Sequence, residues 1–168
     1  LTLTKGLVYL NKIKGIPIPD IHNIQKDYFI IQEFIKDVKH EWRIIKIGNS
    51  FFGHQKLLNR GFASDSGLVG WEDPPKHLLN LVNEICERGN FLCMSVDILE
   101  AGDGQFYVNE LQASFGSYNN SQMYINGVPG RYKLVNGEYI FEEGFFNTFS
   151  SNKLKIEHFI EILSEKWE

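Results

Sequence analysis

The sequence predicts an α+β fold built on a mainly antiparallel sheet flanked by helices. Short apolar runs occur in pairs, and each pair is separated by residues that favour tight turns, which is the pattern of β-hairpins. Apolar residues at helical spacing occur in two segments, 73–89 and 153–167. Hairpins interrupted by single helices are typical of α+β proteins. The glycine-rich phosphate loops of doubly wound folds are absent from the sequence.

The composition is that of an ordinary globular domain. The 168 residues are 43% hydrophobic and 23% charged, so we expect a single domain spanning 1–168. The net charge of −4 does not indicate a nucleic-acid partner, which usually needs a basic surface. No apolar run reaches the ~20 residues that span a bilayer, and no secretion signal is visible, so we expect no membrane partner and a cytoplasmic location. Cys86 and Cys93 lack metal-binding spacing and are expected to be reduced thiols. The sequence does not indicate an oligomeric state.

The first third of the chain is expected to contain strands and one hairpin. Residues 6–10 indicate a short strand, and the apolar run 28–35 indicates a strand covered on both faces. Residues 41–57 indicate a hairpin that turns at Asn49-Ser50. The polar, glycine-bearing segment 59–73 is expected to be a loop of functional length.

The middle of the chain predicts a helix and a second hairpin. The helix is expected to begin after Asp73-Pro74-Pro75 and to end at Gly89. Two strands, 93–99 and 105–111, follow and are joined by a tight turn at 101–104. The residues at helical spacing are Leu78, Leu79, Val82, Ile85 and Cys86.

The last third predicts a loop, a hairpin and a helix. Residues 112–130 are polar and glycine-bearing and are expected to form a long loop, and 131–142 a hairpin that turns at Asn136-Gly137. The final helix is expected from about 153 to 167. One face of it carries Ile156, Phe159, Ile160, Leu163 and Trp167.

Two acidic residues on facing strands are the strongest indication of chemistry. The tight turn makes Asp97 and Glu110 neighbours, and Gln112 points to the same face as Glu110 because side chains alternate along a strand. Two close carboxylates repel unless one is protonated or a cation lies between them. Mg²⁺ prefers oxygen ligands of this kind. The alternative is that both acids merely face solvent, although Asp and Glu are poor strand formers.

A second motif lies upstream. The run Gln32-Glu33-Phe34-Ile35 is followed by Glu41-Trp42-Arg43 and then by an apolar segment that ends at Gly48. Taken alone, this pattern also fits a buried strand flanked by solvated charges.

With both motifs in order, the chain resembles the ATP-grasp superfamily, and within it ligases similar to the ribosomal-protein glutamate ligase and glutathione synthetase. The resemblance covers about residues 25–118 and implies the C-terminal, nucleotide-binding subdomain of that fold. In the family, a hinge strand receives adenine through its backbone, an acid holds the ribose, and an Asp and a Glu-x-Asn hold Mg²⁺ with the ATP phosphates. The resemblance thereby assigns Gln32, Glu33, Phe34 and Ile35 to the hinge, Glu41 to the ribose, and Asp97, Glu110 and Gln112 to Mg²⁺ or Mn²⁺.

Three further segments fit the family, and two positions depart from it. The resemblance makes Lys56 the basic residue near the phosphates, and it places Ser64–Gly67 and Ser114–Ser117 in loops near substrate. Gln112 stands where the family has Asn, and Phe115 stands where it usually has Pro. The family's N-terminal α/β domain and most of its lid subdomain are not recognisable.

The implied reaction is ATP- and Mg²⁺-dependent joining of a carboxylate to an amine or thiol through an acylphosphate. Arg43 and Lys56 are expected to stabilise charge at the transferred phosphoryl group. The substrate is expected to be a small-molecule or peptide carboxylate. One alternative is a non-catalytic ATP-grasp-like module that binds nucleotide or a partner, and another is a binding domain with coincidental acids. His54 and His77 are expected at the surface, and Trp71 in the core.

Overall fold

The computed structural model describes residues 31–61, 63, 66–115, 122–147 and 151–165. The chain divides into two compact units, residues 1–34 and 35–168, and each is considered by itself. All the helices and strands given below belong to the second unit.

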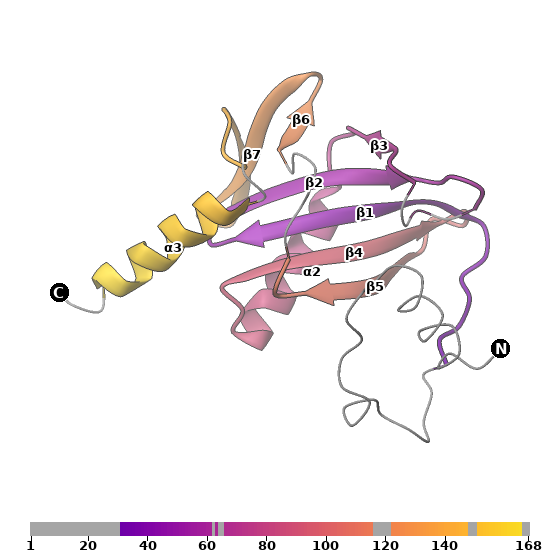
Figure 1. Ribbon diagram of the computed structural model, residues 1–168, viewed down its shortest axis with the longest axis horizontal. Helices are drawn as coiled ribbons and strands as arrows, with labels where there is room; N and C mark the ends of the chain where they lie inside the picture. The colour runs from indigo at the N-terminus through magenta and orange to yellow at the C-terminus, as the bar shows by residue number, and fades with distance from the viewer. Residues whose placement is uncertain (1–30, 62, 64–65, 116–121, 148–150, 166–168) are drawn as a thin grey trace, which may run out of the picture. The chain divides into compact units, whose positions relative to one another are not determined.

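An antiparallel sheet of eight strands forms the second unit, with two helices beside it, as the α+β prediction requires (Figure 1). Its strand order is β5-β4-β1-β2-β7-β6, with β3 paired to β2 and β8 paired to β7. The elements are β1 (Val38–Ile47), β2 (Ser50–Leu57), β3 (Val69–Gly70), α2 (Lys76–Gly89), β4 (Cys93–Ala101), β5 (Phe106–Gln112), β6 (Met123–Ile125), β7 (Val128–Val135), β8 (Glu138–Glu143) and α3 (Asn152–Glu165).

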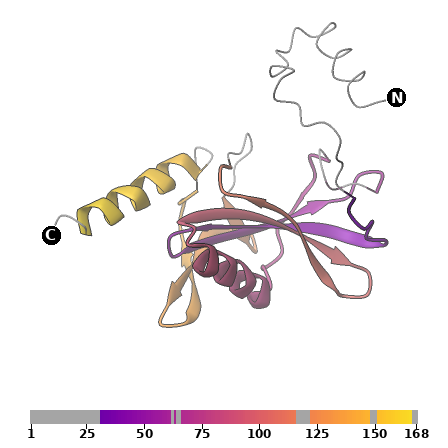
Figure 2. The ribbon, with the colours of Figure 1, turned by 90° about the horizontal axis from the view of Figure 1, so that it is seen from below.

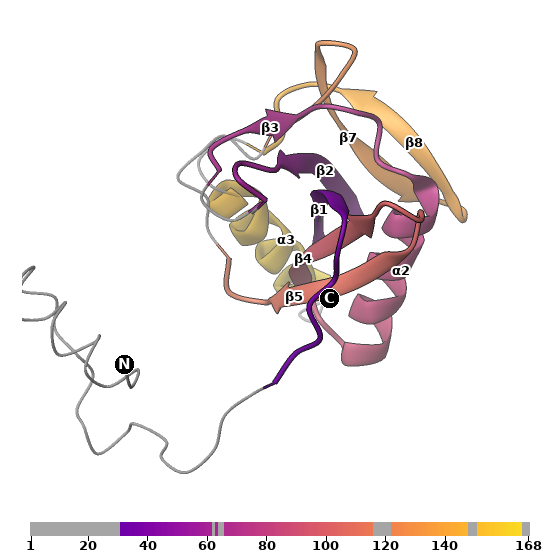
Figure 3. The same cartoon turned by 90° about the vertical axis from the view of Figure 1, so that its right-hand side faces the viewer.

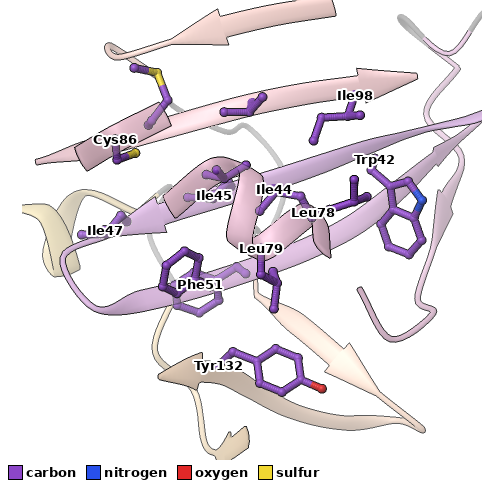
Figure 4. Packing of buried hydrophobic residues seen from close by; sticks show 14 of the residues in the cluster. Trp42, Ile44, Ile45, Ile47, Phe51, Leu78, Leu79, Cys86, Ile98 and Tyr132 are labelled. Atoms are coloured by element: carbon purple, nitrogen blue, oxygen red, sulfur yellow. The ribbon is translucent and has the colours of Figure 1, made fainter. Parts of the chain in front are cut away.

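Helix α2 covers one face of the sheet (Figures 2 and 3). It follows Pro75 as expected, because a proline ring presets the first-turn backbone, and it ends at Asn90 in the left-handed conformation. The predicted apolar stripe is confirmed, since Leu78, Leu79, Val82 and Cys86 are buried. Leu78 and Leu79 lie close to Ile44 of β1 in Figure 4. Burial of each such leucine stabilises the fold by roughly 1.5–3 kcal/mol.

The opposite face of the sheet is divided into an apolar half and a charged half. Strand register and the alternation of side chains place Ile45, Ile47 and Phe52 on this face, near the β1–β2 turn, and all three are buried. Farther along the same two strands, the same face carries Arg43 and Lys56. The charged half is therefore held on strands whose other ends are fixed in the core.

Three predicted hairpins are confirmed. In the first, β1 and β2 turn at Gly48 and Asn49, one residue earlier than expected, because Ile47 pairs with Ser50 and Gly48 takes the positive φ of 54°. In the second, β4 and β5 are joined through 102–105, and in the third, β7 and β8 turn at Asn136-Gly137.

The expected long loop 112–130 is wrong for part of its length. Strand β6 and the start of β7 lie within it and turn at Asn126-Gly127, where both residues have positive φ. An Asn-Gly pair between β-branched and aromatic residues is the usual signal of such a turn, so the sequence did contain this hairpin. Strand β3 likewise lies within the segment 59–73, which was expected to be loop only.

The expected strand 28–35 is wrong where the structure describes it. Residues 31–35 are not in a strand, and Ile31 and Phe34 are 83% and 75% exposed. Strand propensity becomes a strand only where a neighbouring strand completes the hydrogen bonds, and in the described residues no ladder includes this segment. The rest of this run, and the expected strand 6–10, lie outside the described residues.

Helix α3 forms as expected, but its apolar face is exposed. Ile156, Phe159, Ile160 and Leu163 are 40–59% exposed, and no α3 residue is buried. The side chains that contact the body include Leu154, which packs against the core, Lys155, which lies over the ring of Phe115, and His158, which lies against Gly48. Neither α3 nor α2 is long and apolar enough to cross a membrane. Cys86 and Cys93 are free thiols; Cys86 is buried, and Cys93 is half-buried.

Candidate active site

Charged side chains from four adjacent strands meet on the face opposite α2. Arg43 of β1 lies directly opposite Asp97 of β4, and Asp97 lies directly opposite Glu110 of β5. Glu41 lies opposite Lys56 of β2. These residues, together with Asn109 of β5, are referred to below as the charged cluster: Glu41, Arg43, Lys56, Asp97, Asn109 and Glu110. Its two cations face three carboxylates, which leaves one negative charge in excess.

Asp97 is the centre of the charged cluster. The Nε and Nη2 atoms of Arg43 donate to its two carboxylate oxygens at 2.8 Å each, and Lys56 donates to Oδ2 at 2.5 Å. Burial by itself would raise the pKa of Asp97, but the hydrogen bonds from Arg43 and Lys56 outweigh it and hold that pKa below its usual value. Asp97 is therefore a buried anion whose charge is maintained by two cations.

Lys56 is shared between two acids. It donates to Asp97 and also to Oε1 of Glu41, whose other carboxylate oxygen accepts a hydrogen bond of 3.1 Å from Asn109. Asn109 occupies the point where the β4–β5 register shifts, since Asp97 pairs with Glu110 and Ile98 pairs with Val108. The bulge thus brings an amide donor to Glu41, which is only 2% exposed.

Glu110 and Gln112 lie on the exposed edge of the sheet. The Glu110 side chain is exposed and forms no hydrogen bond with the described residues, and Gln112 is half-buried opposite Ser95. The neighbouring positions predicted for Asp97 and Glu110 are therefore confirmed.

The oxygen atoms of Asp97, Glu110 and Gln112 decide whether this edge can hold a metal ion. Mg²⁺ usually takes one or two carboxylates together with phosphate oxygens and waters. Asp97 and Glu110 supply two carboxylates, and Gln112 an amide oxygen. In the part of the chain that the structure describes, no three acidic, His or Cys side chains come together as a metal site. The donors do not fit a metal ion enclosed by protein alone, because both Asp97 oxygens already accept hydrogen bonds from Arg43 and Lys56. They would fit a metal ion that phosphate oxygens also hold.

An aromatic row borders the charged cluster. His54, opposite Arg43 in β2, has its ring centre 5.6 Å from that of Trp71, which is 5.0 Å from that of Tyr124. Burial, with help from the positive charges of Arg43 and Lys56, lowers the pKa of His54 to about 4. His54 was expected at the surface but is half-buried, whereas His77 is exposed as expected. Trp71 is 37% exposed and does not lie in the core.

The hinge candidates span the boundary between the two units along the chain. Gln32, Glu33 and Phe34 belong to the first unit and are exposed, and Ile35 is half-buried at the start of the second. The adenine-binding role of this segment stays a prediction. Ser64 and Asp65, and the end of the segment 114–117, lie outside the described residues, while Phe115 is buried and its ring contacts Lys155.

Two members of this region were not predicted. Asn109 is placed by a bulge, and a single-residue shift in register leaves no signature that the sequence reveals. His54 could have been found, because it lies two positions before Lys56 and side chains two positions apart share a face of a strand.

A hollow of about 740 Å³ lies elsewhere, between α3, β7 and the β1–β2 turn. It contains no residue of the charged cluster, and its charged side chains, such as Lys133 and Glu161, are of both signs. The cluster, and not this hollow, collects the residues that the sequence singled out.

No protein-family model matches the chain, and neither a curated protein nor a solved structure is significantly similar to it. The charged cluster therefore has to be interpreted from its own geometry and chemistry.

Proposed function

We propose that this chain is the nucleotide- and metal-binding part of an ATP-grasp ligase, which uses ATP and Mg²⁺ to join a carboxylate to an amine or thiol. One observation supports this above the others: Arg43, Lys56, Asp97 and Glu110 come from four adjacent strands and meet on one face. The β4–β5 hairpin explains why Asp97 lies beside Glu110. It does not explain why the two cations Arg43 and Lys56 lie on the same face next to them.

Phosphoryl transfer needs these residue types in one place. A substrate carboxylate oxygen bonds to the terminal phosphorus of ATP as ADP leaves, and the amine or thiol then displaces phosphate from the acyl carbon. Catalysis of such steps is mostly positioning and neutralisation of charge. Arg43 and Lys56 would bind phosphate oxygens, since their side chains are 23% and 17% exposed and reach solvent. Mg²⁺ held by Asp97, Glu110 and Gln112 would neutralise further phosphate charge.

A second candidate is a non-catalytic module that binds nucleotide or a partner. It is favoured by the completeness of the ion pairing, because Arg43, Lys56, Glu41 and Asp97 already satisfy one another. Paired networks of this kind also occur for purely structural reasons. The two candidates differ in whether bound ATP is consumed.

A thermal-shift titration with ADP or ATP, with and without Mg²⁺, tests the proposal. A ligand that binds only the folded state raises the melting temperature, by an amount that grows with its concentration. We expect a rise that needs Mg²⁺ and is lost in Asp97→Asn and in Glu110→Gln. Glu110 is the cleaner position, because it is exposed and its replacement leaves the buried ion pairs intact.

Glu100→Gln is the matched control. Glu100 lies on the same strand as Asp97 but pairs with Lys39 and His40, on the other face, and should leave the nucleotide shift unchanged. No shift with wild-type protein at millimolar nucleotide would contradict the proposal. A shift without ADP formation in the presence of candidate carboxylates would support the binding module instead.

A further inference from the structure

The two metal ligands of the proposed function, Asp97 and Glu110, differ in exposure and hydrogen bonding, although they lie side by side in β4 and β5. The Asp97 side chain is 3% exposed, and both of its oxygens accept hydrogen bonds from Arg43 and Lys56. The Glu110 side chain is exposed and accepts none from the described residues. The Asp97 oxygens are thus occupied by two cationic side chains, while in the described part of the chain the Glu110 oxygens are free to bind a ligand.

We infer that Arg43 and Lys56 form an electrostatic latch on Asp97, which rejects a free divalent cation and admits one only together with a polyanion. This inference rests on the proposed function, because it takes Asp97 and Glu110 as the metal ligands. A divalent ion approaching Asp97 alone would meet two positive charges in contact with the carboxylate, and like charges at such distances repel strongly.

A phosphate chain removes this obstacle because it competes for the same cations. The ends of Arg43 and Lys56 are partly exposed, so phosphate oxygens can bind them without opening the core. Charge-assisted hydrogen bonds to phosphate are as strong as those to carboxylate. Once the cations turn to phosphate, Asp97 becomes an available ligand.

Glu41 and Asn109 would hold the Lys56 side chain near the sheet while it moves away from Asp97. Lys56 also donates to Glu41, and Asn109 holds the other oxygen of Glu41. Lys56 can therefore release Asp97 and remain bound to the sheet. Metal and polyanion then favour each other's binding, and this coupling is reciprocal. The preferred ligand is a complex of a divalent metal with a polyphosphate.

Binding of Mn²⁺ alone, measured by titration calorimetry and by water-proton relaxation, tests the latch. Wild-type protein is expected to bind Mn²⁺ weakly. Lys56→Gln removes one repelling charge and is expected to tighten Mn²⁺ binding by about tenfold or more. Adding Glu110→Gln to that variant should abolish the gain. For inorganic tripolyphosphate without metal, Lys56→Gln is expected to weaken binding.

Lys56→Gln leaves the buried carboxylate of Glu41 without its cation, which could unfold the protein. A second variant is therefore needed. Glu41→Gln/Lys56→Gln removes both charges together and should show the same tightening of Mn²⁺ in a folded protein. Lys46→Gln is the matched control: this buried lysine pairs with Glu87 at 3.0 Å, on the other face of β1, and should leave Mn²⁺ affinity unchanged.

Unchanged or weaker Mn²⁺ binding in the folded double variant overturns the latch. So does wild-type protein that binds Mn²⁺ as tightly as the variants. These readouts contain no nucleotide, so the latch can fail while the Mg²⁺-dependent ADP shift still supports the ligase. Loss of that ADP shift together with the expected Mn²⁺ results would reject the ligase and keep the latch.

Discussion

Arg43 donates two parallel hydrogen bonds of 2.8 Å to the carboxylate of Asp97 on the neighbouring strand. The two residues are directly opposed in the β1–β4 ladder, 54 positions apart in the sequence. Paired bonds of this kind fix both distance and angle, and they are among the strongest that side chains form. The pair therefore sets where the charge of Asp97 lies relative to β2 and β5.

The stability of the Arg43–Asp97 pair can be measured with a double-mutant cycle. Arg43→Gln leaves a buried carboxylate with Lys56 as its only cation, and we expect the free energy of unfolding in urea to fall by about 2–4 kcal/mol. Asp97→Asn should also destabilise. The double variant should lose less than the sum of the two, with a coupling of about 1–3 kcal/mol. If the two losses of unfolding free energy are additive, the interaction between Arg43 and Asp97 does not stabilise the fold.

Stability should depend on pH through His54. Its pKa is about 4 when folded, below the usual 6.5, mainly because of burial. The unfolded chain therefore binds more protons between these values, so the stabilisation from neutral His54 is complete above about pH 6.5 and is lost as pH falls toward 4. Between pH 7 and pH 5 we expect the free energy of unfolding to fall by about 2 kcal/mol.

Urea denaturation of His54→Asn at the same two pH values checks this expectation. The variant should lose most of the pH dependence, whereas His77→Asn, at an exposed position, should keep it. Asp97 does not interfere, because its folded-state pKa lies below the usual aspartate value and its contribution is lost only below about pH 4. Equal slopes for wild type and His54→Asn would show that His54 is not protected from protonation.

Local sequence signals predicted three of the hairpins and two residues of the charged cluster, Asp97 and Glu110. Asp97 and Glu110 could be paired in advance, because a tight turn joins their strands and leaves few possible registers. Arg43 and Lys56 were singled out only by resemblance, because the β1–β4 pairing brings together segments with a loop and a helix between them. Such long-range pairing depends on the packed core and not on any local pattern.

The same limit explains the errors. The apolar run at 31–35 has strand-forming residues, but in the described part of the chain no partner strand lies beside it. Periodicity located the apolar face of α3 correctly, yet it carries no information on what that face contacts. The missed turn at Asn126-Gly127 is different, because its signal was present in the sequence.

Gly53 should resist replacement by alanine. A Cβ atom there would lie 2.4 Å from Cγ of Pro74 and 3.0 Å from Cδ1 of Ile44, where α2 begins against the sheet. We expect Gly53→Ala to destabilise the fold by about 1–3 kcal/mol, because the residues around it cannot move apart freely. Gly89→Ala is the control. The three atoms nearest to its Cβ would all belong to the ring of Phe91, which is 41% exposed and can swing away, so the helix should gain up to about 1 kcal/mol. Equal effects of the two changes in chemical denaturation would contradict the packing at Gly53.

The exposed face of α3 gives the last prediction. Phe159 and Ile156 are 53% and 59% exposed, so Phe159→Gln and Ile156→Gln should each change the free energy of unfolding by no more than about 0.5 kcal/mol. Leu154→Ala, on the side that packs against the core, should cost more, about 1–2 kcal/mol. Urea denaturation at two protein concentrations tests both statements together. A large loss at Phe159 that is independent of concentration would mean that another part of the same chain covers the helix. A loss that grows with protein concentration would mean that a second copy does, because only association between molecules depends on concentration.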